Sequence, residues 1–295
     1  MAGIFISGFA DEIDNDFKLQ LQTVTGLGMR YISLRSAYGK NIGNYTWEEV
    51  QAELLPLLKE YGVGVSSLGS PIGKVKINDP EAVAKQRDQL EELCRIAKGL
   101  ECRYIRMFSF YTDEEKPMEE QREAILQGLR DFIAIAAAHD IVLIHENEKD
   151  IYGDNLARNV DLMNELAGPH FGSAFDFANF VQCGEDTWEC WQAMQPFVRY
   201  IHIKDAVSHD NENVLFGTGE GQGERILAQA IKNQGYEGFL TLEPHLVIFD
   251  SLKQLEIKDA GEVIKENKAE SGADGYRMTY EALTEILERN EICFE

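Results

Sequence analysis

Short apolar runs alternate with longer amphipathic segments from one end of the chain to the other. Eight of these runs have the length of strands and are apolar at most positions rather than at every second one. This pattern is typical of parallel strands that are covered on both faces. The predicted strands span 3–10, 31–35, 63–68, 104–110, 141–147, 172–177, 200–205 and 238–243.

The segments between these strands repeat apolar residues at helical spacing. One of them begins with Thr46 and Glu49, which form a capping-box pattern, and carries Pro56 in its middle. Because proline lacks an N–H, it should kink this helix or shift its start. The predicted helices span 16–28, 46–62, 79–99, 119–140, 155–168, 187–195, 224–235 and 276–290.

Eight strands, each followed by a helix, predict an α/β fold, a single (β/α)8 TIM barrel over residues 1–295. A doubly wound open sheet is the alternative, but no glycine-rich phosphate turn follows the first strand. The segment 245–275 departs from the alternation of strands and helices, because it is polar, charged and long for a connection. We expect an extended loop or lid over the site there.

Four ionisable side chains lie near the ends of four consecutive predicted strands. They are Glu146 in IVLIHENE, Asp176 in GSAFDFANF, His202 in VRYIHIKD and Glu243 in GFLTLEPH. A carboxylate at the end of a buried run is costly to desolvate without a partner. The carboxyl ends of barrel strands meet at one face, so the four side chains should point to one place. This mixture of carboxylates and imidazole predicts a site for one divalent ion, Mn²⁺, Mg²⁺, Co²⁺ or Zn²⁺.

Other polar residues near these strand ends are candidates for substrate binding. Lys204 shares a strand face with His202, two residues earlier, and should look toward the same mouth. Asn179 comes three residues after Asp176 and can hydrogen-bond a hydroxyl group. His245 follows the last predicted strand by two residues and should approach a bound substrate.

Two arginines lie in the second and fourth predicted strands. An arginine inside a barrel needs an anion, so Arg35 and Arg106 should each pair with an acid or hold a substrate oxygen. Pairing with an acid is favoured for both, and Arg106 is retained as a substrate-binding candidate. His145 alternates away from Glu146 and should be structural, whereas Glu148 lies past the strand and should be solvated.

The run FGTGEGQGE at 216–224 has a glycine at every second position after the seventh predicted strand. Barrels often hold a phosphate on backbone N–H groups there, but the run matches neither GxGxxG nor a P-loop, and a flexible loop is favoured. After the first strand, Asp11 and Asp14 should open the first helix as N-terminal acids.

The chain is strongly acidic, with 28 Lys and Arg against 51 Asp and Glu, a formal charge of −23. This charge repels phosphate backbones and anionic membrane surfaces, so nucleic acid and membrane are not expected partners. No apolar stretch has the length of a membrane span, of about 18 residues. The five cysteines include no CxxC pair, which favours reduced thiols and a cytoplasmic enzyme.

The segments SGFADEI, SSLGSPIGK, HENE, FDFANF, HIKD and LEPH together point to a known family. They resemble the sugar phosphate isomerase/epimerase family of xylose-isomerase-like TIM barrels, which includes ketose 3-epimerases and inosose dehydratases. The resemblance implies that Glu146, Asp176, His202 and Glu243 are four metal ligands. It also implies that Glu146 and Glu243 are catalytic and move protons on opposite faces of the substrate.

The function implied is a metal-dependent isomerase or epimerase that acts on a small carbohydrate, a sugar or sugar phosphate. One carboxylate removes a proton next to a carbonyl, and a divalent cation, with Mn²⁺ the first choice, stabilises the enediolate. The alternative is an inosose-dehydratase-like lyase on the same site. The chain carries Asn179 where epimerases often have histidine, and Arg35 where many have an acid.

Two further classes rank below these. An apurinic endonuclease-like hydrolase uses many histidines and grips DNA with basic residues, whereas this chain has six histidines and a charge of −23. A non-catalytic carbohydrate-binding barrel should have lost one of the four ligands, and none is missing. Barrels of this type often pair, so a homodimer is an expected assembly.

Overall fold

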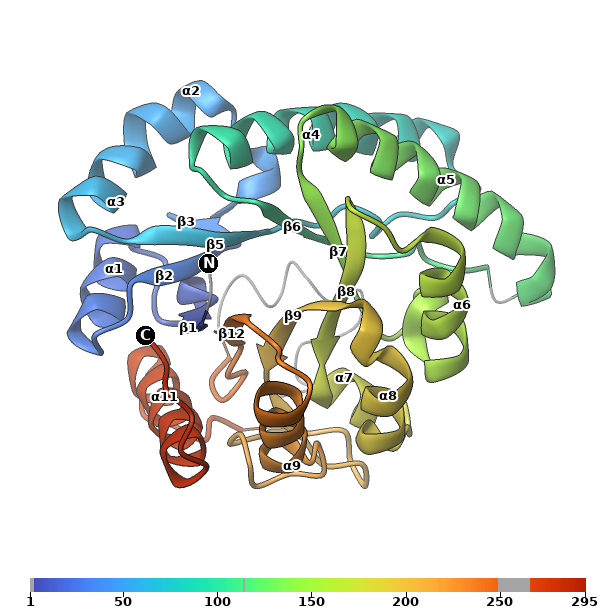
Figure 1. The fold of residues 1–295 in the computed structure, drawn as a ribbon. Helices are drawn as coiled ribbons and strands as arrows, with labels where there is room; N and C mark the ends of the chain where they lie inside the picture. Colours follow the sequence, from blue (N-terminus) through green and yellow to red (C-terminus); the bar gives the residue numbers. More distant parts are fainter. Residues whose placement is uncertain (1–2, 114, 249–265) are drawn as a thin grey trace.

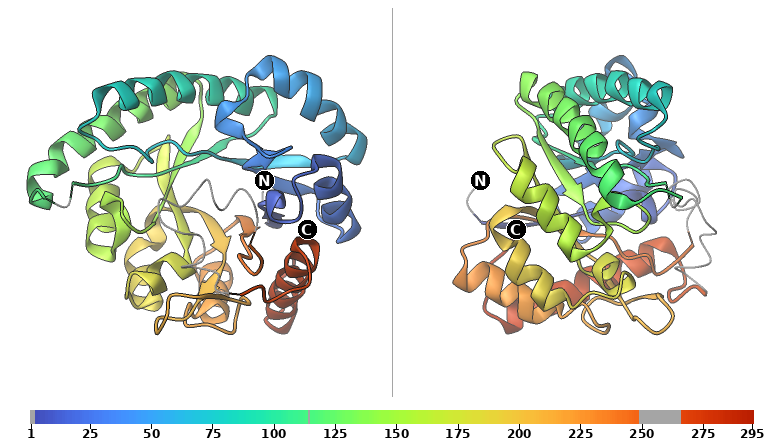
Figure 2. Two further views of the ribbon diagram at one scale, coloured as in Figure 1. Left: turned by 180° about the vertical axis from the view of Figure 1, so that it is seen from behind. Right: turned by 90° about the vertical axis from the view of Figure 1, so that its right-hand side faces the viewer.

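Eight parallel strands form a barrel that is surrounded by helices (Figure 1, Figure 2). The computed structural model describes residues 3–113, 115–248 and 266–295. All eight predicted strands are present, each shorter than its apolar run or shifted by a few residues. They are β1 (Ile4–Gly8), β2 (Tyr31–Leu34), β5 (Gly64–Gly69), β6 (Tyr104–Met107), β7 (Val142–Glu146), β8 (Phe171–Asp176), β9 (Val198–Ile203) and β12 (Gly238–Leu242).

The strands pair in the order β1-β12-β9-β8-β7-β6-β5-β2, so each lies beside its neighbour in the βα series. A parallel bridge between Phe9 and Ser33 joins the two edge strands. Glu295 adds to the edge of β1 by hydrogen bonds with the backbone of Ile4 and Ile6, at 2.9 and 2.8 Å. The predicted (β/α)8 barrel is therefore confirmed, and the open-sheet alternative is excluded.

Helices follow the strands and cover the outside of the barrel, and all eight predicted helical segments are found. The main helices are α1 (Phe17–Gly26), α4 (Pro80–Gly99), α5 (Met118–Ala138), α6 (Leu156–Leu166), α8 (Thr187–Met194), α9 (Gly223–Ala228) and α11 (Gly272–Arg289). A short additional helix, α7 (Phe177–Gln182), follows β8 directly and was not predicted.

In the segment 46–62, Pro56 lies where a second helix begins. Thr46 and Glu49 form the predicted capping box at the start of α2 (Trp47–Glu49). A π-helical turn over Val50–Leu54 then leads into α3 (Leu55–Tyr61). Pro56 lies in the first turn of α3, where its missing N–H leaves no bond unmade. The proline therefore shifts the start of a second helix, as expected.

Two short hairpins extend the mouth of the barrel. One consists of β3 (Ser36–Ala37) and β4 (Lys40–Asn41) after β2, and the other of β10 (Asp205–Ala206) and β11 (Asn213–Val214) after β9. The expected lid over 245–275 falls largely on residues 249–265, which lie outside the described residues. Across the described ranges, no helix combines the length and apolar character that a membrane crossing requires.

Tyr200 forms the floor below the barrel mouth. Its hydroxyl bonds the side chains of Ser66, Ser67 and Thr241 at 2.8, 3.0 and 2.6 Å, and all four residues are buried. Tyr200 lies two residues before His202 on β9, so both face the interior, and their rings are 5.7 Å apart. This hydrogen-bonded plug supports the side chains above it.

Candidate metal centre

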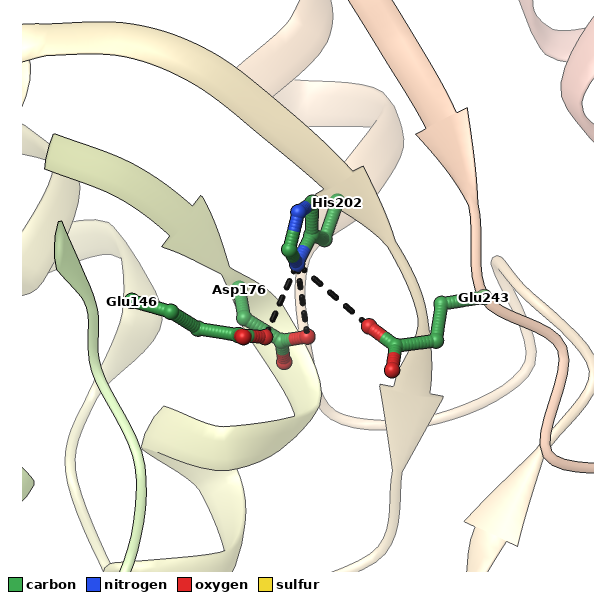
Figure 3. A group of neighbouring side chains, drawn as sticks. All are labelled: Glu146, Asp176, His202 and Glu243. Carbon is green, nitrogen blue, oxygen red and sulfur yellow. Dashed lines mark hydrogen bonds and ion pairs between the residues drawn. The ribbon is translucent and has the colours of Figure 1, made fainter. Parts of the chain in front are cut away.

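Four consecutive strand ends bring their polar side chains to one point in the barrel mouth (Figure 3). Glu146 ends β7, Asp176 ends β8, His202 lies near the end of β9, and Glu243 directly follows β12. Pairing of β8 with β9 places Asp176 opposite His202. One nitrogen or oxygen atom of each residue lies within 4.8 Å of the others, and all four side chains are buried. The structure thus brings together the four residues singled out in the sequence.

The imidazole of His202 is the centre of this cluster. Its Nδ1 lies 2.8 Å from Glu146 Oε1, 3.3 Å from Glu243 Oε2 and 3.9 Å from Asp176 Oδ2. Asp176 Oδ1 accepts the backbone N–H of Asn179 and caps α7. Asp176 Oδ2 has no hydrogen-bond partner among the described residues, and coordination to a divalent cation would satisfy this oxygen.

The pKa values show how this site behaves without a cation. Burial disfavours the imidazolium of His202, but the Glu146 and Glu243 carboxylates outweigh it and raise its pKa to about 9. Burial also raises the pKa of Asp176 above its usual range, against the attraction of Lys204. Because metal ligands must be deprotonated, a cation that enters this site displaces protons from these groups.

Each glutamate divides its two oxygens between an arginine and the centre. Arg106 Nη1 donates to Glu146 Oε2 at 2.8 Å, and Arg35 Nη1 donates to Glu243 Oε1 at 3.0 Å. The other oxygen of each glutamate faces His202. Both arginines therefore pair with acids, as expected, and both glutamates are oriented by a buried ion pair.

Arg35 also holds two acids that follow β1. Its Nε donates to Asp11 at 2.9 Å and its Nη2 to Glu12 at 3.1 Å, because a 3-10 turn at Ala10–Glu12 buries both acids in the barrel mouth. The expectation that Asp11 and Asp14 open the first helix is wrong, because the first turn of α1 contains no acid and Asp16 caps it instead. Glu12 was missed in the sequence, although a buried arginine required an acid nearby.

The remaining substrate-binding candidates also lie against the centre. Lys204 Nζ is 3.1 Å from Asn179 Oδ1 and 4.0 Å from Asp176 Oδ2. His245 Nε2 lies 3.8 Å from an oxygen of Glu243, and its backbone N–H donates to Glu12 at 2.8 Å. All of these side chains are buried.

Glu148 was expected to be solvated, but it is largely buried. It forms an ion pair with Lys74 at 3.2 Å, so its charge is neutralised outside the centre. His145 is buried and faces away from the centre, against Gly153 and Phe171, which agrees with the expectation of a structural role.

The alternating glycines wrap around a carboxylate. The backbone N–H groups of Gly217, Gly219 and Gly221 donate to Asp205 at 2.9, 3.0 and 2.9 Å. A Cβ added at Gly219 would lie 2.5 Å from the carbonyl oxygen of Ala206 and from Asp205. This loop therefore uses its amides to bind a protein carboxylate, and it does not present them to a phosphate.

Comparison with known proteins identifies the family of this barrel. A sequence model of the xylose isomerase-like TIM barrel family matches residues 21–269. The chain is 21% identical over 212 residues to a 3-dehydroshikimate dehydratase of Bacillus anthracis, covering 70% of this chain and 74% of the relative. It is 22% identical over 232 residues to the L-ribulose-5-phosphate 3-epimerase UlaE of Escherichia coli, covering 76% and 80%.

Among solved structures, that of the IOLI protein with a bound zinc atom superposes with a TM-score of 0.72. The alignment covers 98% of this chain and 99% of that one at 15% identity, which shows a shared fold. The family match spans most of the barrel, including all four strand ends of the centre. The chain belongs to the xylose isomerase-like TIM barrel family.

Proposed function

We propose that this protein is a divalent-metal-dependent isomerase or epimerase that moves a proton next to a carbonyl of a small carbohydrate. The observation that carries the proposal is the convergence of three carboxylates and one imidazole within 4.8 Å in the buried barrel mouth. The relatives support the reaction class, because one is named an epimerase and another a dehydratase. The names give 3-dehydroshikimate and L-ribulose 5-phosphate as the substrates of those two relatives.

The charges around the centre support one divalent ion. When its ligands are deprotonated, as metal binding requires, the centre and its ion-paired neighbours carry five buried carboxylates against three buried cations, which leaves two negative charges. A divalent cation neutralises that excess and removes the cost of burying it. The carboxylates are Asp11, Glu12, Glu146, Asp176 and Glu243, and the cations are Arg35, Arg106 and Lys204.

In this proposal, Glu146, Asp176, His202 and Glu243 hold the ion, with Mn²⁺ the first choice among divalent metals. The zinc atom of the IOLI structure supports a divalent ion in this fold. When bound, the cation acts as a Lewis acid and stabilises the negative charge that develops on the carbonyl oxygen of the substrate.

Proton transfer falls to the two glutamates. Glu146 and Glu243 lie on either side of His202, each with one oxygen turned inward (Figure 3). One carboxylate takes the proton from the carbon next to the carbonyl, and the other returns a proton from the opposite face. Return to the same carbon gives the epimer, and return to the neighbouring carbon gives the aldose–ketose isomer.

Four polar side chains are proposed to hold the substrate oxygens. Lys204 and Asn179 form one side of the mouth, and His245 approaches from the segment after β12. Arg106 Nε is buried and has no hydrogen-bond acceptor among the described residues, so it can donate to a substrate oxygen while Nη1 holds Glu146. These donors favour a substrate with several hydroxyl or carbonyl oxygens.

A dehydratase is the second candidate, and the buried ammonium group of Lys204 favours it. Lys204 is 4.0 Å from Asp176, so its ammonium group can donate a proton to the β-hydroxyl, which leaves as water while the electron pair of the intermediate forms the carbon–carbon double bond. The 3-dehydroshikimate dehydratase relative supports this reaction. The two candidates share the first step and differ in the fate of the intermediate.

Exchange of substrate hydrogen with deuterated solvent tests the shared step. Protein reconstituted with Mn²⁺ is incubated in D2O with ketoses, their phosphates, inososes and 3-dehydroshikimate, and mass spectrometry is applied after quenching. We expect metal-dependent incorporation of one deuterium next to the carbonyl of at least one compound, and the products then distinguish the reactions. The absence of exchange in all compounds with Mn²⁺, Co²⁺, Mg²⁺ and Zn²⁺ would contradict the proposal.

A further inference from the structure

A second set of metal-type ligands lies directly beside the centre and shares Glu243 with it. Glu12, Glu243 and His245 each offer one atom within 4.8 Å of the others, and all three are buried. His245 Nε2 is 3.8 Å from Glu12 Oε1 and 3.8 Å from Glu243 Oε1. Two carboxylates and an imidazole form a ligand set that suits a divalent cation. A second ion here would be bridged to the first through the carboxylate of Glu243.

Arg35 already satisfies the two carboxylate oxygens of this second set. Its Nη1 lies 3.0 Å from Glu243 Oε1 and its Nη2 lies 3.1 Å from Glu12 Oε1, the same atoms that face His245. The guanidinium is fully buried, is held by Asp11 at 2.9 Å and stacks over the ring of Phe9 at 4.4 Å. A divalent ion near these oxygens would face a fixed positive charge in a low-dielectric interior.

We propose that Arg35 is a built-in substitute for a second divalent cation and limits the centre to one metal ion per chain. This inference rests on the proposed function, because it requires the first site to bind metal. Arg35 acts as a positioning residue. It holds Oε1 of Glu243 and leaves Oε2, which lies 3.3 Å from His202 Nδ1, for the first ion.

The limit to one ion bears on the chemistry of Glu243. A carboxylate that bridges two divalent cations gives a lone pair from each oxygen and loses most of its basicity. A carboxylate that meets a guanidinium on one side keeps more of its capacity to accept a proton, because a hydrogen bond from arginine neutralises less charge than a metal ion. Arg35 therefore satisfies the buried acids and leaves Glu243 more basic than a second bridging cation would.

Manganese stoichiometry and electron paramagnetic resonance test this inference. The natural protein is expected to bind one Mn²⁺ per chain and to show the spectrum of an isolated ion. Arg35→Met and Arg35→Gln remove the charge and are expected to bind two Mn²⁺, with a spectrum of two coupled ions. Arg35→Lys keeps a cation and is expected to remain at one. Arg106→Met is the matched control, because it removes the other arginine while leaving Glu12, Glu243 and His245 unchanged.

In Arg35→Met and Arg35→Gln, the buried acids Asp11, Glu12 and Glu243 lose their shared ion-pair partner, which should destabilise the fold. Both variants are therefore also refolded in the presence of Mn²⁺. A second ion should supply the missing charge, and we expect Mn²⁺ to raise their melting temperature more than that of the natural protein. Neutral variants that stay unfolded in saturating Mn²⁺, or that bind only one ion, would overturn the inference about Arg35 and leave the proposed function standing. Two ions in the natural protein would overturn it directly. Binding of no ion by the natural protein would instead remove the proposed function.

Discussion

At the scale of single residues, the centre depends on how each carboxylate uses its two oxygens. Glu146 and Glu243 both give one oxygen to an arginine and one to the centre, and Asp176 gives one to the N-terminus of α7. The sequence predicted that the arginines pair with acids, because a buried guanidinium needs an anion. It did not indicate which acids, since Glu243 and Arg35 are 208 residues apart.

Glu243 is buried at the centre and Glu148 is partly buried outside it, and the two acids have different expected effects on metal binding. Glu243→Ala removes a proposed ligand and should weaken Mn²⁺ binding by roughly 100-fold or more. Glu148→Ala removes an acid that is paired with Lys74, and should change the affinity by less than about 5-fold because exposed or paired charges outside the centre act weakly. Isothermal titration with Mn²⁺ measures both values. A larger loss of affinity in Glu148→Ala than in Glu243→Ala would show that Glu148, and not Glu243, is the metal ligand.

His145 is a buried histidine with an acid-sensitive environment. Burial lowers its pKa from 6.5 to about 4, and neither ring nitrogen has a hydrogen-bond partner among the described residues. Its folded pKa lies below the unfolded value, so its stability contribution is present above pH 6.5 and is lost as pH falls toward 4. The shift corresponds to about 3 kcal/mol.

His145→Leu should remove this penalty, because leucine does not titrate and needs no hydrogen bond. Urea unfolding at pH 7 and pH 4.5 measures it as the difference between the variant and the natural protein. We expect the variant to be about as stable at pH 7 and clearly more stable than the natural protein at pH 4.5. A loss of equal size at both pH values would show that packing against Gly153, not titration, dominates at this position.

At the scale of elements, hydrophobic periodicity predicted the strands and helices of the barrel because parallel strands are buried on both faces. The two-residue strands β3, β4, β10 and β11 were not predicted, since such short elements carry no periodicity. Helix α7 was missed because its FANFVQ sequence continues the apolar run of β8, and only the cap by Asp176 separates the two. The glycine run was recognised, but its partner Asp205 was not, because the contact forms only in three dimensions.

Gly219 tests the role of the loop around Asp205. Gly219→Ala would place a methyl group 2.5 Å from the Ala206 carbonyl oxygen, so the loop must shift and we expect a loss of about 1–3 kcal/mol. Gly26→Ala, at the end of α1, meets no atom within 4 Å and should be neutral or stabilising by up to about 1 kcal/mol. Chemical denaturation measures both. Equal stability of the two variants would contradict the account of a closely packed glycine loop.

At the scale of the whole molecule, an acidic chain concentrates buried positive charge at one end of its barrel. The net charge is −23, yet Arg35, Arg106 and Lys204 are all buried in the mouth. The place of the centre was predictable because carboxyl ends of barrel strands meet at one face. The contribution of Glu12 to the mouth was not predictable, because this residue lies in a 3-10 turn that has no distinctive sequence pattern.

Binding of a divalent metal to the deprotonated ligands of the mouth should stabilise the folded protein. Removal of metal by a chelator and dialysis should lower the melting temperature, and Mn²⁺ at about 100 times its dissociation constant should restore about 2.7 kcal/mol. For a chain of 295 residues this corresponds to a rise of roughly 4–5 °C, measured by calorimetry. His202→Ala removes the imidazole at the centre of the cluster and should lose most of this rise, whereas NaCl at matched ionic strength should reproduce little of it. An equal rise with NaCl, or in His202→Ala, would assign the effect to the acidic surface, because general screening of −23 charges requires neither this histidine nor a divalent ion.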